Sequence, residues 1–270
     1  MYGVKDRFYQ MSSISVVIPS LGRDSLQRAI DSVLAQTYPI NEVLIILSTR
    51  NVDKYLIERY SRHNFIHFLI NENGNAASNR NIGICTSKSD FIAFLDDDDI
   101  WHYNKIEVQM KYTEYDVISS KAFYRGYSKG IRPSKLFEAN ILESFYPSRI
   151  PMRRKSVIPT PTIVIRSSIA KANLFDENLN EREDIWFLYN LEKAGKKFIQ
   201  INDVLATVYT RKPLIDRKIS METDFEWYAR LESCQKGVGK NFFWSVALRN
   251  RFFHGNMADF FGLLRLYLAK

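Results

Sequence analysis

The sequence predicts an α/β fold built around a mainly parallel sheet. Short apolar segments rich in β-branched residues alternate with amphipathic segments over the first hundred residues. This alternation is typical of βαβ units, in which helices connect parallel strands. The 270 residues are 46% hydrophobic and 25% charged, which is the composition of one large folded domain or of one domain with a small appendage. Disordered, collagen-like and disulfide-rich classes are therefore excluded.

Each strand expected in the first hundred residues is an apolar run of five or six residues, and Pro19 is expected to end the first of them. The first helix places Leu26, Ala29 and Ile30 on one face. Since ligands of parallel sheets bind at the carboxyl ends of the strands, the loops after these strands are expected to converge on one crevice. The predicted strands are 14–18, 42–47, 65–69 and 91–95, and the predicted helices are 25–36, 52–61 and 75–86.

The pattern weakens over residues 116–156, which we interpret as a connection and insertion with a basic, aromatic stretch at 121–135. It returns in the following fifty residues, where apolar runs again alternate with a helical period. An acidic loop at 175–184 precedes the second of two predicted helices. The strands predicted here are 160–165, 197–201 and 204–209, and the helices are 168–173 and 185–194.

The C-terminal part differs in composition. Residues 241–270 mix aromatic, aliphatic and basic residues at helical spacing. Two interpretations stay open, namely a helix pair lying on a membrane surface and a helical hairpin packed on the core. Apolar runs are shorter than the roughly 20 residues that a membrane span needs. We divide the chain into an N-terminal extension (1–12), a main domain (13–210) and a helical, membrane-associating segment (211–270).

The charge balance points to an anionic partner. Lys and Arg number 38 against 30 Asp and Glu, which gives a net charge of +8. A nucleotide, a lipid phosphate, a membrane surface or a nucleic acid fits this excess, although no nucleic-acid recognition motif is found. The only two cysteines, Cys85 and Cys234, lie far apart, and the N-terminus lacks the layout of a signal peptide. A cytoplasmic setting is therefore expected.

Four consecutive aspartates, Asp96, Asp97, Asp98 and Asp99, follow the apolar strand 91–95. Adjacent carboxylates repel one another unless a cation or hydrogen-bond donors hold them. Mg²⁺ or Mn²⁺ commonly binds one or two carboxylates and completes its shell with water and substrate phosphate. The run therefore predicts a divalent-metal site, with a solvated acidic turn or helix cap as the alternative.

Four strings together resemble the family 2 inverting glycosyltransferases of the GT-A fold. They are SVVIPSLGRDSLQRAIDSVLAQTYP, GNAASNRNIGI, FIAFLDDDDIWHYNKIEVQ and TPTIVIRSSIAKANLFDENLNEREDIWFLYNLEKAGKKF. The resemblance covers about residues 13–210 and follows the expected order of motifs. It implies a GT-A domain that takes a nucleotide-sugar donor, and it leaves the C-terminal residues uncovered.

The resemblance also implies roles for single residues. Asp96 and Asp98 would form the D-x-D motif, with Asp98 binding the metal and Asp96 near the ribose or a metal-bound water. Glu183 and Asp184 fall on the family's E-D pair, with Asp184 as general base. Arg80 falls where the family often carries an arginine beside the nucleotide, and a surface helix arginine is the alternative. The implied nucleotide-sugar contacts are Pro19, Ser20, Leu21, Gly22, Arg23, Ser48, Arg80, Asp96, Asp97 and Arg211.

One departure concerns the nucleotide. Family members usually end the second strand in an acidic turn, whereas this chain has Leu47, Ser48, Thr49 and Arg50. Ser48 and Thr49 are expected to donate hydrogen bonds to uracil instead. UDP is chosen by its frequency in the family.

Elementary chemistry agrees with these roles. Glycosyl transfer needs a cation to neutralise the leaving diphosphate and a base to take the acceptor proton as its oxygen attacks from the opposite face. One carboxylate suffices for inversion, whereas retention by double displacement needs a second. Asp184 precedes a predicted helix, where the dipole favours a carboxylate, and a helix cap is its alternative role.

Residues near the acceptor are also predicted. Trp186 would lie one helical step beyond the base and stack on the acceptor sugar beside Glu183, although such a Trp more often packs in a core. Arg211 and Lys212 would close over the diphosphate, or would form a solvated turn. A basic cluster in the insertion and the C-terminal segment suit an anionic lipid and a lipid-diphosphate acceptor. The cluster comprises Arg149, Arg153, Arg154 and Lys155.

The expected activity is a metal-dependent transfer of galactose or glucose from a UDP-sugar to undecaprenyl-diphosphate-linked GlcNAc or GalNAc. Such a reaction belongs to O-antigen or capsule synthesis and takes place at the inner face of the cytoplasmic membrane. The alternatives are an acceptor in the lipopolysaccharide core, a soluble acceptor, a non-catalytic nucleotide-sugar binder and a nucleic-acid-binding protein.

Overall fold

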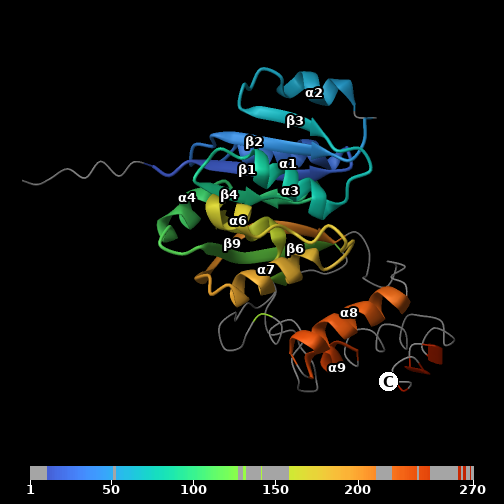
Figure 1. Ribbon diagram of the computed structural model, residues 1–270. Helices are drawn as coiled ribbons and strands as arrows, with labels where there is room; N and C mark the ends of the chain where they lie inside the picture. Colours follow the sequence, from blue (N-terminus) through green and yellow to red (C-terminus); the bar gives the residue numbers. More distant parts are fainter. Residues whose placement is uncertain are drawn as a thin grey trace, which may run out of the picture.

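The protein is a mixed α/β structure with helices on both faces of one sheet (Figure 1). The computed structural model describes residues 11–50, 53–126, 130–131, 141, 158–210, 221–235, 237–243, 261–262, 264–265 and 268. Within this part of the chain the sheet has nine strands, eight of them in the order β3-β2-β1-β4-β8-β6-β9-β5, with β7 paired to β6.

The first half of the sheet is parallel, as the sequence predicts. Each of its strands is joined to the next by a helix, and β1 lies between β2 and β4. The α/β fold with parallel βαβ units is therefore confirmed here. The elements are β1 (Ile14–Ser20), α1 (Ser25–Leu34), β2 (Glu42–Leu47), α2 (Lys54–Tyr60), β3 (Ile66–Ile70), α3 (Ala76–Thr86) and β4 (Phe91–Phe94).

The second half of the sheet is mixed. Strand β8 is antiparallel to β4 and β6, β6 is parallel to β9, and β9 is antiparallel to β5. The elements are β5 (Ile100–Trp101), α4 (Lys105–Gln109), η1 (Met110–Tyr112), β6 (Val117–Gly126), β7 (Gly130–Ile131), η2 (Thr160–Thr162), β8 (Val164–Arg166), α6 (Ser167–Ala172), α7 (Glu183–Lys193), β9 (Phe198–Thr210), α8 (Met221–Cys234) and α9 (Val238–Phe242).

Three expectations for this half are wrong. Strand β6 lies in the stretch interpreted as a connection, because its buried Ser119 and Ser120 interrupt the apolar run that marks a strand. The two strands expected at 197–209 form one long strand, β9, whose break in pattern coincides with a register shift opposite Lys121. The strand expected at 160–165 begins as a 3₁₀ turn, η2, and only its end joins the sheet as β8.

Pro19 does not end the first strand, which continues through it to Ser20 in register with β2. Leu95 N–H donates to the carbonyl of Val17 at 3.1 Å, so alternate residues of β1, including Pro19, direct their backbone groups toward β4. Pairing with β4 ends at Val17 and Phe94. The missing N–H of Pro19 therefore costs no ladder bond.

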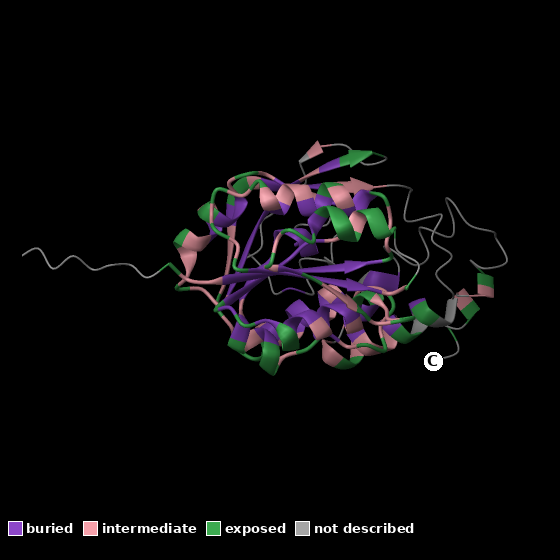
Figure 2. Cartoon of the chain, turned by 90° about the horizontal axis from the view of Figure 1, so that it is seen from above, coloured by how far each residue is buried: buried purple, intermediate pink, exposed green. Residues whose placement is uncertain are grey.

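The core has two layers, one on each face of the sheet. Figure 2 shows the buried strands between helices that turn their exposed sides outward. Along β1, Val17 packs into one layer, whereas Val16 and Ile18 pack into the other with α1. This alternation is what the period of two along a strand requires.

The described C-terminal helices pack on the core. In Figure 1, α8 and α9 lie beyond α7, far from β3. Their apolar side chains belong to the same core layer as those of α7. Most of residues 241–270, to which the two interpretations apply, lies outside the described residues, so both stay open. Within the described residues, we find no helix of the length and apolarity required to cross a membrane. The contributing residues are Trp227, Leu231, Val238, Phe242 and Phe243.

Candidate active site

The loops at the carboxyl ends of β1 to β4 meet at one edge of the sheet, as expected for a parallel arrangement. Ser48 N–H donates to the carbonyl of Ser20 at 2.9 Å, and Asn71 N–H donates to the carbonyl of Leu47 at 2.8 Å. The Ser20 hydroxyl donates to Asp97 at 2.8 Å, which ties the loop after β1 to the aspartate run after β4. The loops after these strands therefore lie together, as the sequence predicts.

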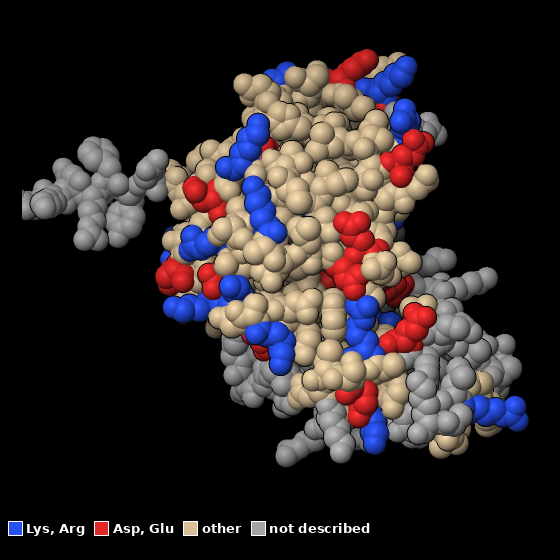
Figure 3. All heavy atoms as spheres, viewed as in Figure 1, with Lys and Arg blue, Asp and Glu red and all other residues tan. Residues whose placement is uncertain are grey.

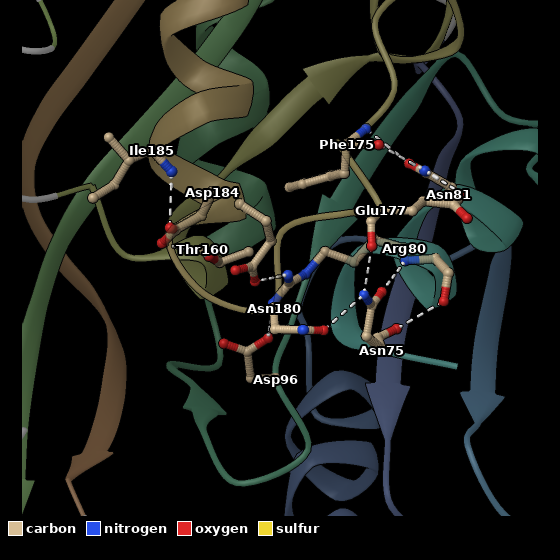
Figure 4. Close-up of polar contacts among 12 residues, drawn as sticks. Asn75, Arg80, Asn81, Asp96, Thr160, Phe175, Glu177, Asn180, Asp184 and Ile185 are labelled. Atoms are coloured by element: carbon tan, nitrogen blue, oxygen red, sulfur yellow. Dashed lines mark hydrogen bonds and ion pairs between the residues drawn. The ribbon is translucent and has the colours of Figure 1, made fainter. Parts of the chain in front are cut away.

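Helix α3 organises three of the surrounding loops through consecutive buried residues. Asn79 Nδ2 donates to the Ser48 hydroxyl at 2.8 Å, and Asn81 Nδ2 donates to the carbonyl of Phe175 at 2.9 Å. Arg80 lies between them, and Figure 4 shows side chains from α3, from the end of β4 and from the loop before α7 converging around it. Sequence reasoning missed Asn79 and Asn81, although asparagines inside a helix are a signal because they favour caps and turns.

Arg80 bridges two carboxylates. Its Nη2 donates to Asp96 Oδ1 and its Nη1 to Glu183 Oε1, both at 2.7 Å. Arg80 is only 3% exposed, and its guanidinium carbon lies 5.4 Å from the centre of the Phe175 ring. A buried charge is tolerated when it is paired and hydrogen-bonded, so this bridge fixes the aspartate run relative to the start of α7. A contact between Arg80 and the nucleotide stays a prediction.

The four aspartates divide into two kinds. Asp97 is buried and accepts hydrogen bonds from Ser20 Oγ, from Leu21 N–H at 3.1 Å and from Arg23. Asp99 is also buried and accepts from Tyr209 N–H at 2.8 Å. Its burial, together with the neighbouring carboxylates, raises the pKa of Asp99 well above its ordinary value. Both of these carboxylates are buried and accept hydrogen bonds from the protein, so neither is exposed to a ligand.

Asp96 and Asp98 are the carboxylates that remain partly open, with side chains 31% and 23% exposed. Arg23 Nη1 lies 3.6 Å from Asp98 Oδ2. Among the described residues, no group of three or more Asp, Glu, His or Cys side chains is arranged to enclose a metal. Two accessible carboxylates without a closed cage fit Mg²⁺ or Mn²⁺, which take one or two carboxylates and the substrate's phosphates.

Asp184 lies in the first turn of α7. Its Oδ1 accepts from Ile185 N–H at 2.8 Å, and its Oδ2 accepts from the Thr160 hydroxyl at 3.4 Å (Figure 4). Burial is the main cause that raises the pKa of Asp184 to about 6, and the negative charge of Glu183 adds to it. A carboxylate with this pKa is ionised near neutral pH yet basic enough to accept a proton, which suits a general base.

Trp186 lies on α7 in a packed environment. Its ring centre is 6.0 Å from that of Trp227 and 5.3 Å from that of Tyr189, and the guanidinium carbon of Arg230 lies 4.7 Å from the ring centre. These contacts are those of the packing alternative. Stacking of Trp186 on an acceptor sugar stays a prediction.

The remaining predicted residues differ in how far the structure describes them. Leu21, in the loop after β1, is 55% exposed, and Gly22 has a φ of 73°, in the region that favours glycine. The Ser48 hydroxyl donates to the carbonyl of Gly74 at 2.7 Å, so a hydrogen bond to uracil would have to replace this one. Arg211, Lys212 and the basic cluster Arg149, Arg153, Arg154 and Lys155 lie outside the described residues.

A mixed α/β sheet that carries partly exposed carboxylates at the end of β4 fits a GT-A type glycosyltransferase domain. The chain belongs to glycosyl transferase family 2, whose sequence model matches residues 15–175. The expected family and enzyme class are thereby confirmed.

Several relatives are similar over large parts of the chain. The poly(ribitol-phosphate) beta-N-acetylglucosaminyltransferase TarP of Staphylococcus aureus is 27% identical over 252 residues, which are 86% of this chain and 73% of TarP. The amylovoran biosynthesis glycosyltransferase AmsB of Erwinia amylovora is 27% identical over 73% of this chain and 69% of AmsB. An uncharacterized glycosyltransferase of Rickettsia bellii is 31% identical over 64% of this chain, which spans only 25% of that relative.

Solved structures support the fold. The crystal structure of S. aureus TarS 1–349 matches 89% of this chain and 74% of that chain with a TM-score of 0.62 at 16% identity. The same TarS region in complex with UDP-GlcNAc matches with a TM-score of 0.61. The predicted GT-A architecture is thus confirmed.

Proposed function

We propose that the protein is a metal-dependent inverting glycosyltransferase that moves a hexose from a UDP-sugar to a hydroxyl of a cell-surface polysaccharide precursor. The observation that carries the proposal is that Arg80 bridges Asp96, at the end of β4, to Glu183, which precedes Asp184 in the chain. Burial raises the pKa of Asp184 to about 6. The donor class is supported by the TarS complexes with UDP and UDP-GlcNAc. The polysaccharide context is supported by the names of TarP and AmsB.

The donor is held at the loops after β1 and β4. The Arg23 side chain, in the loop after β1, is 37% exposed and therefore accessible to a nucleotide diphosphate. Asp98 and Asp96 would hold Mn²⁺ or Mg²⁺, and the ion would supply positive charge to the departing diphosphate. Asp97 holds the loop after β1 in place by accepting hydrogen bonds from the Ser20 hydroxyl and from Leu21 N–H.

Asp184 acts as general base. Its carboxylate takes the proton of the acceptor hydroxyl while that oxygen forms a bond to the anomeric carbon. The bond from this carbon to the donor's phosphate oxygen breaks on the opposite face, so the configuration inverts and UDP leaves. Glu183 accepts a hydrogen bond from Arg80, and Asp184 is the carboxylate of the pair that serves as base, with a pKa that burial raises to about 6.

The acceptor class is proposed from charge. A sugar carried on a lipid diphosphate is anionic, and it suits the net charge of +8. Acidic and basic side chains are interspersed on the described surface seen in Figure 3, and the basic cluster 149–155 lies outside the described residues. We propose undecaprenyl-diphosphate-linked GlcNAc or GalNAc as acceptor, galactose or glucose as the sugar transferred, and peripheral association with the inner membrane face.

A second candidate rests on TarP. Its name gives a β-N-acetylglucosaminyl transfer to poly(ribitol phosphate), and it is similar over 86% of this chain. An anionic polyol-phosphate polymer fits the same charge, with UDP-GlcNAc as donor.

A donor-by-acceptor screen separates these candidates. UDP release is measured with UDP-Gal, UDP-Glc and UDP-GlcNAc against GlcNAc- and GalNAc-diphosphate-lipids and poly(ribitol phosphate), in Mn²⁺, in Mg²⁺ and in EDTA. We expect release that depends on both acceptor and metal, and a β-linked product from the α-linked donor. An α-linked product, or full activity in EDTA, would contradict the proposal. Asp203→Asn, which removes an exposed carboxylate of β9, is the matched control for Asp184→Asn.

A further inference from the structure

Helix α7 starts from an unusual backbone position. Arg182, which immediately precedes Glu183 and Asp184, has φ 64° and ψ 15°, in the left-handed region. Among the described residues other than glycine, Asn73 is the only further one with positive φ, and asparagine tolerates this region better than arginine does. Such a conformation persists only where its surroundings hold it.

The side chain of Arg182 is held by α8 and α9. Its Nη2 donates to Asp224 Oδ1 at 2.6 Å, and the two side chains are only 12% and 5% exposed. The guanidinium carbon lies 4.9 Å from the centre of the Phe242 ring and 5.9 Å from that of Trp227. A charged hydrogen bond within an apolar, aromatic enclosure is strong and directional.

A second contact holds the other end of the same loop. Arg230, on α8, donates from Nη1 to Asp176 Oδ2 at 2.7 Å, and its guanidinium also lies over the ring of Trp186. Asp176 and Arg182 bracket the loop that leads into Glu183 and Asp184. Helix α8 therefore fixes both ends of this loop from outside the sheet.

We propose that Arg182 is a positioning residue for Asp184, and that the docking of α8 through Asp224 holds the start of α7 in its working geometry. The inference rests on the proposed function for the role of Asp184. A change in the φ and ψ of Arg182 moves the next two residues directly, because they follow it in the chain. Helix α8 is then part of the catalytic unit, because its contacts hold the loop that leads into Asp184.

The test uses the full chain with Asp224→Asn, which keeps the shape of the side chain and removes its charge. We expect kcat to fall at least about tenfold and the donor KM to change less, because α8 contacts the loop before α7 directly and reaches the aspartate run only through Glu183 and Arg80. Glu226→Gln is the matched control, since Glu226 is an exposed carboxylate on the same helix. It is expected to leave both constants unchanged.

Two further measurements keep the inference falsifiable. Hydrogen exchange of peptides covering 175–190 is expected to speed up about tenfold in Asp224→Asn, while β1 and β2 keep their protection. Hydrogen exchange does not depend on the reaction, so it tests the attachment of the loop to α8 separately from the proposed function. The proposed function is tested by the turnover of Asp184→Asn. Arg182→Lys, which keeps the charge but loses the planar fork, is expected to retain an intermediate kcat even if Asp224→Asn folds poorly. Wild-type kcat in Arg182→Lys, or unchanged exchange over 175–190 in a folded Asp224→Asn, overturns the inference.

Discussion

Replacing Asp184 with asparagine is expected to stabilise the folded chain at neutral pH. Burial, followed by the charge of Glu183, raises the pKa of Asp184 from its ordinary 3.8 to about 6, a difference of about two pKa units. At about 1.36 kcal/mol per unit, the folded state disfavours the ionised form by up to about 3 kcal/mol. Because the residue is partly exposed, solvent screening reduces the expected gain to about 1–2 kcal/mol.

The gain has a defined pH window. A carboxyl whose folded pKa is raised contributes stability that is fully present below pH 3.8 and is lost as the pH rises through about 6. Asparagine carries no such titration. The variant is therefore expected to be more stable than wild type at pH 7.5, with the difference shrinking progressively toward pH 4.

Urea unfolding of both proteins at pH 7.5 and pH 4.5, without donor or metal, measures this difference. Asp203→Asn serves as control, because Asp203 is exposed and its replacement is expected to change stability by less than about 0.5 kcal/mol at either pH. The reasoning is refuted if Asp184→Asn shows no gain at pH 7.5, or if the gain is as large at pH 4.5.

Three further substitutions test other parts of the structure. Lys105 is fully buried over the ring of Trp101, and its amine has no hydrogen-bond partner among the described residues. Burial lowers the pKa of Lys105 well below 10.5. Urea unfolding of Lys105→Met is therefore expected to show a gain in stability of about 1–3 kcal/mol at pH 7 and a smaller gain near pH 10, and a loss at pH 7 would contradict this. In Gly83→Ala the new methyl group would overlap Val17 Cγ1, so thermal unfolding should show a loss of about 1–3 kcal/mol, and a wild-type Tm would refute the close packing of α3 on β1. Arg80→Met leaves the carboxylates of Asp96 and Glu183 without their partner. The variant is expected to lose about 3–5 kcal/mol of stability in urea unfolding and to release UDP about a hundredfold more slowly. Unchanged values in both assays would contradict the bridge.

The sequence was sufficient for the parallel half of the sheet, and the reason is local. Strands β1, β2 and β4 each contain at least three consecutive apolar residues, and helices such as α1 show one apolar face, so local pattern identifies them. Strand β6 was not predicted, because its buried serines interrupt the apolar pattern. Their hydroxyl groups find hydrogen-bond partners elsewhere in the fold, as Ser119 does with the carbonyl of Ile199. Local pattern carries no information on such partners.

The candidate site divides in the same way. The aspartate run and Asp184 could be identified from motifs. Which aspartates of the run are buried and which are partly exposed could not. Asp97 accepts a hydrogen bond from Ser20, in the loop after β1. Arg80 joins Asp96 and Glu183, which lie 16 and 103 positions away in the chain. The attachment of Arg182 to α8 is equally non-local, because it depends on a helix whose sequence is not covered by the family resemblance.

The central claim is that Asp184 is the base of an inverting transfer. The most direct measurement is the turnover of Asp184→Asn with the donor and acceptor pair found in the screen, followed as UDP release beside Asp203→Asn. The account predicts a fall in kcat of about 10²- to 10⁴-fold for Asp184→Asn at an unchanged donor KM, and wild-type turnover for the control. Turnover of Asp184→Asn within about twofold of wild type would contradict it.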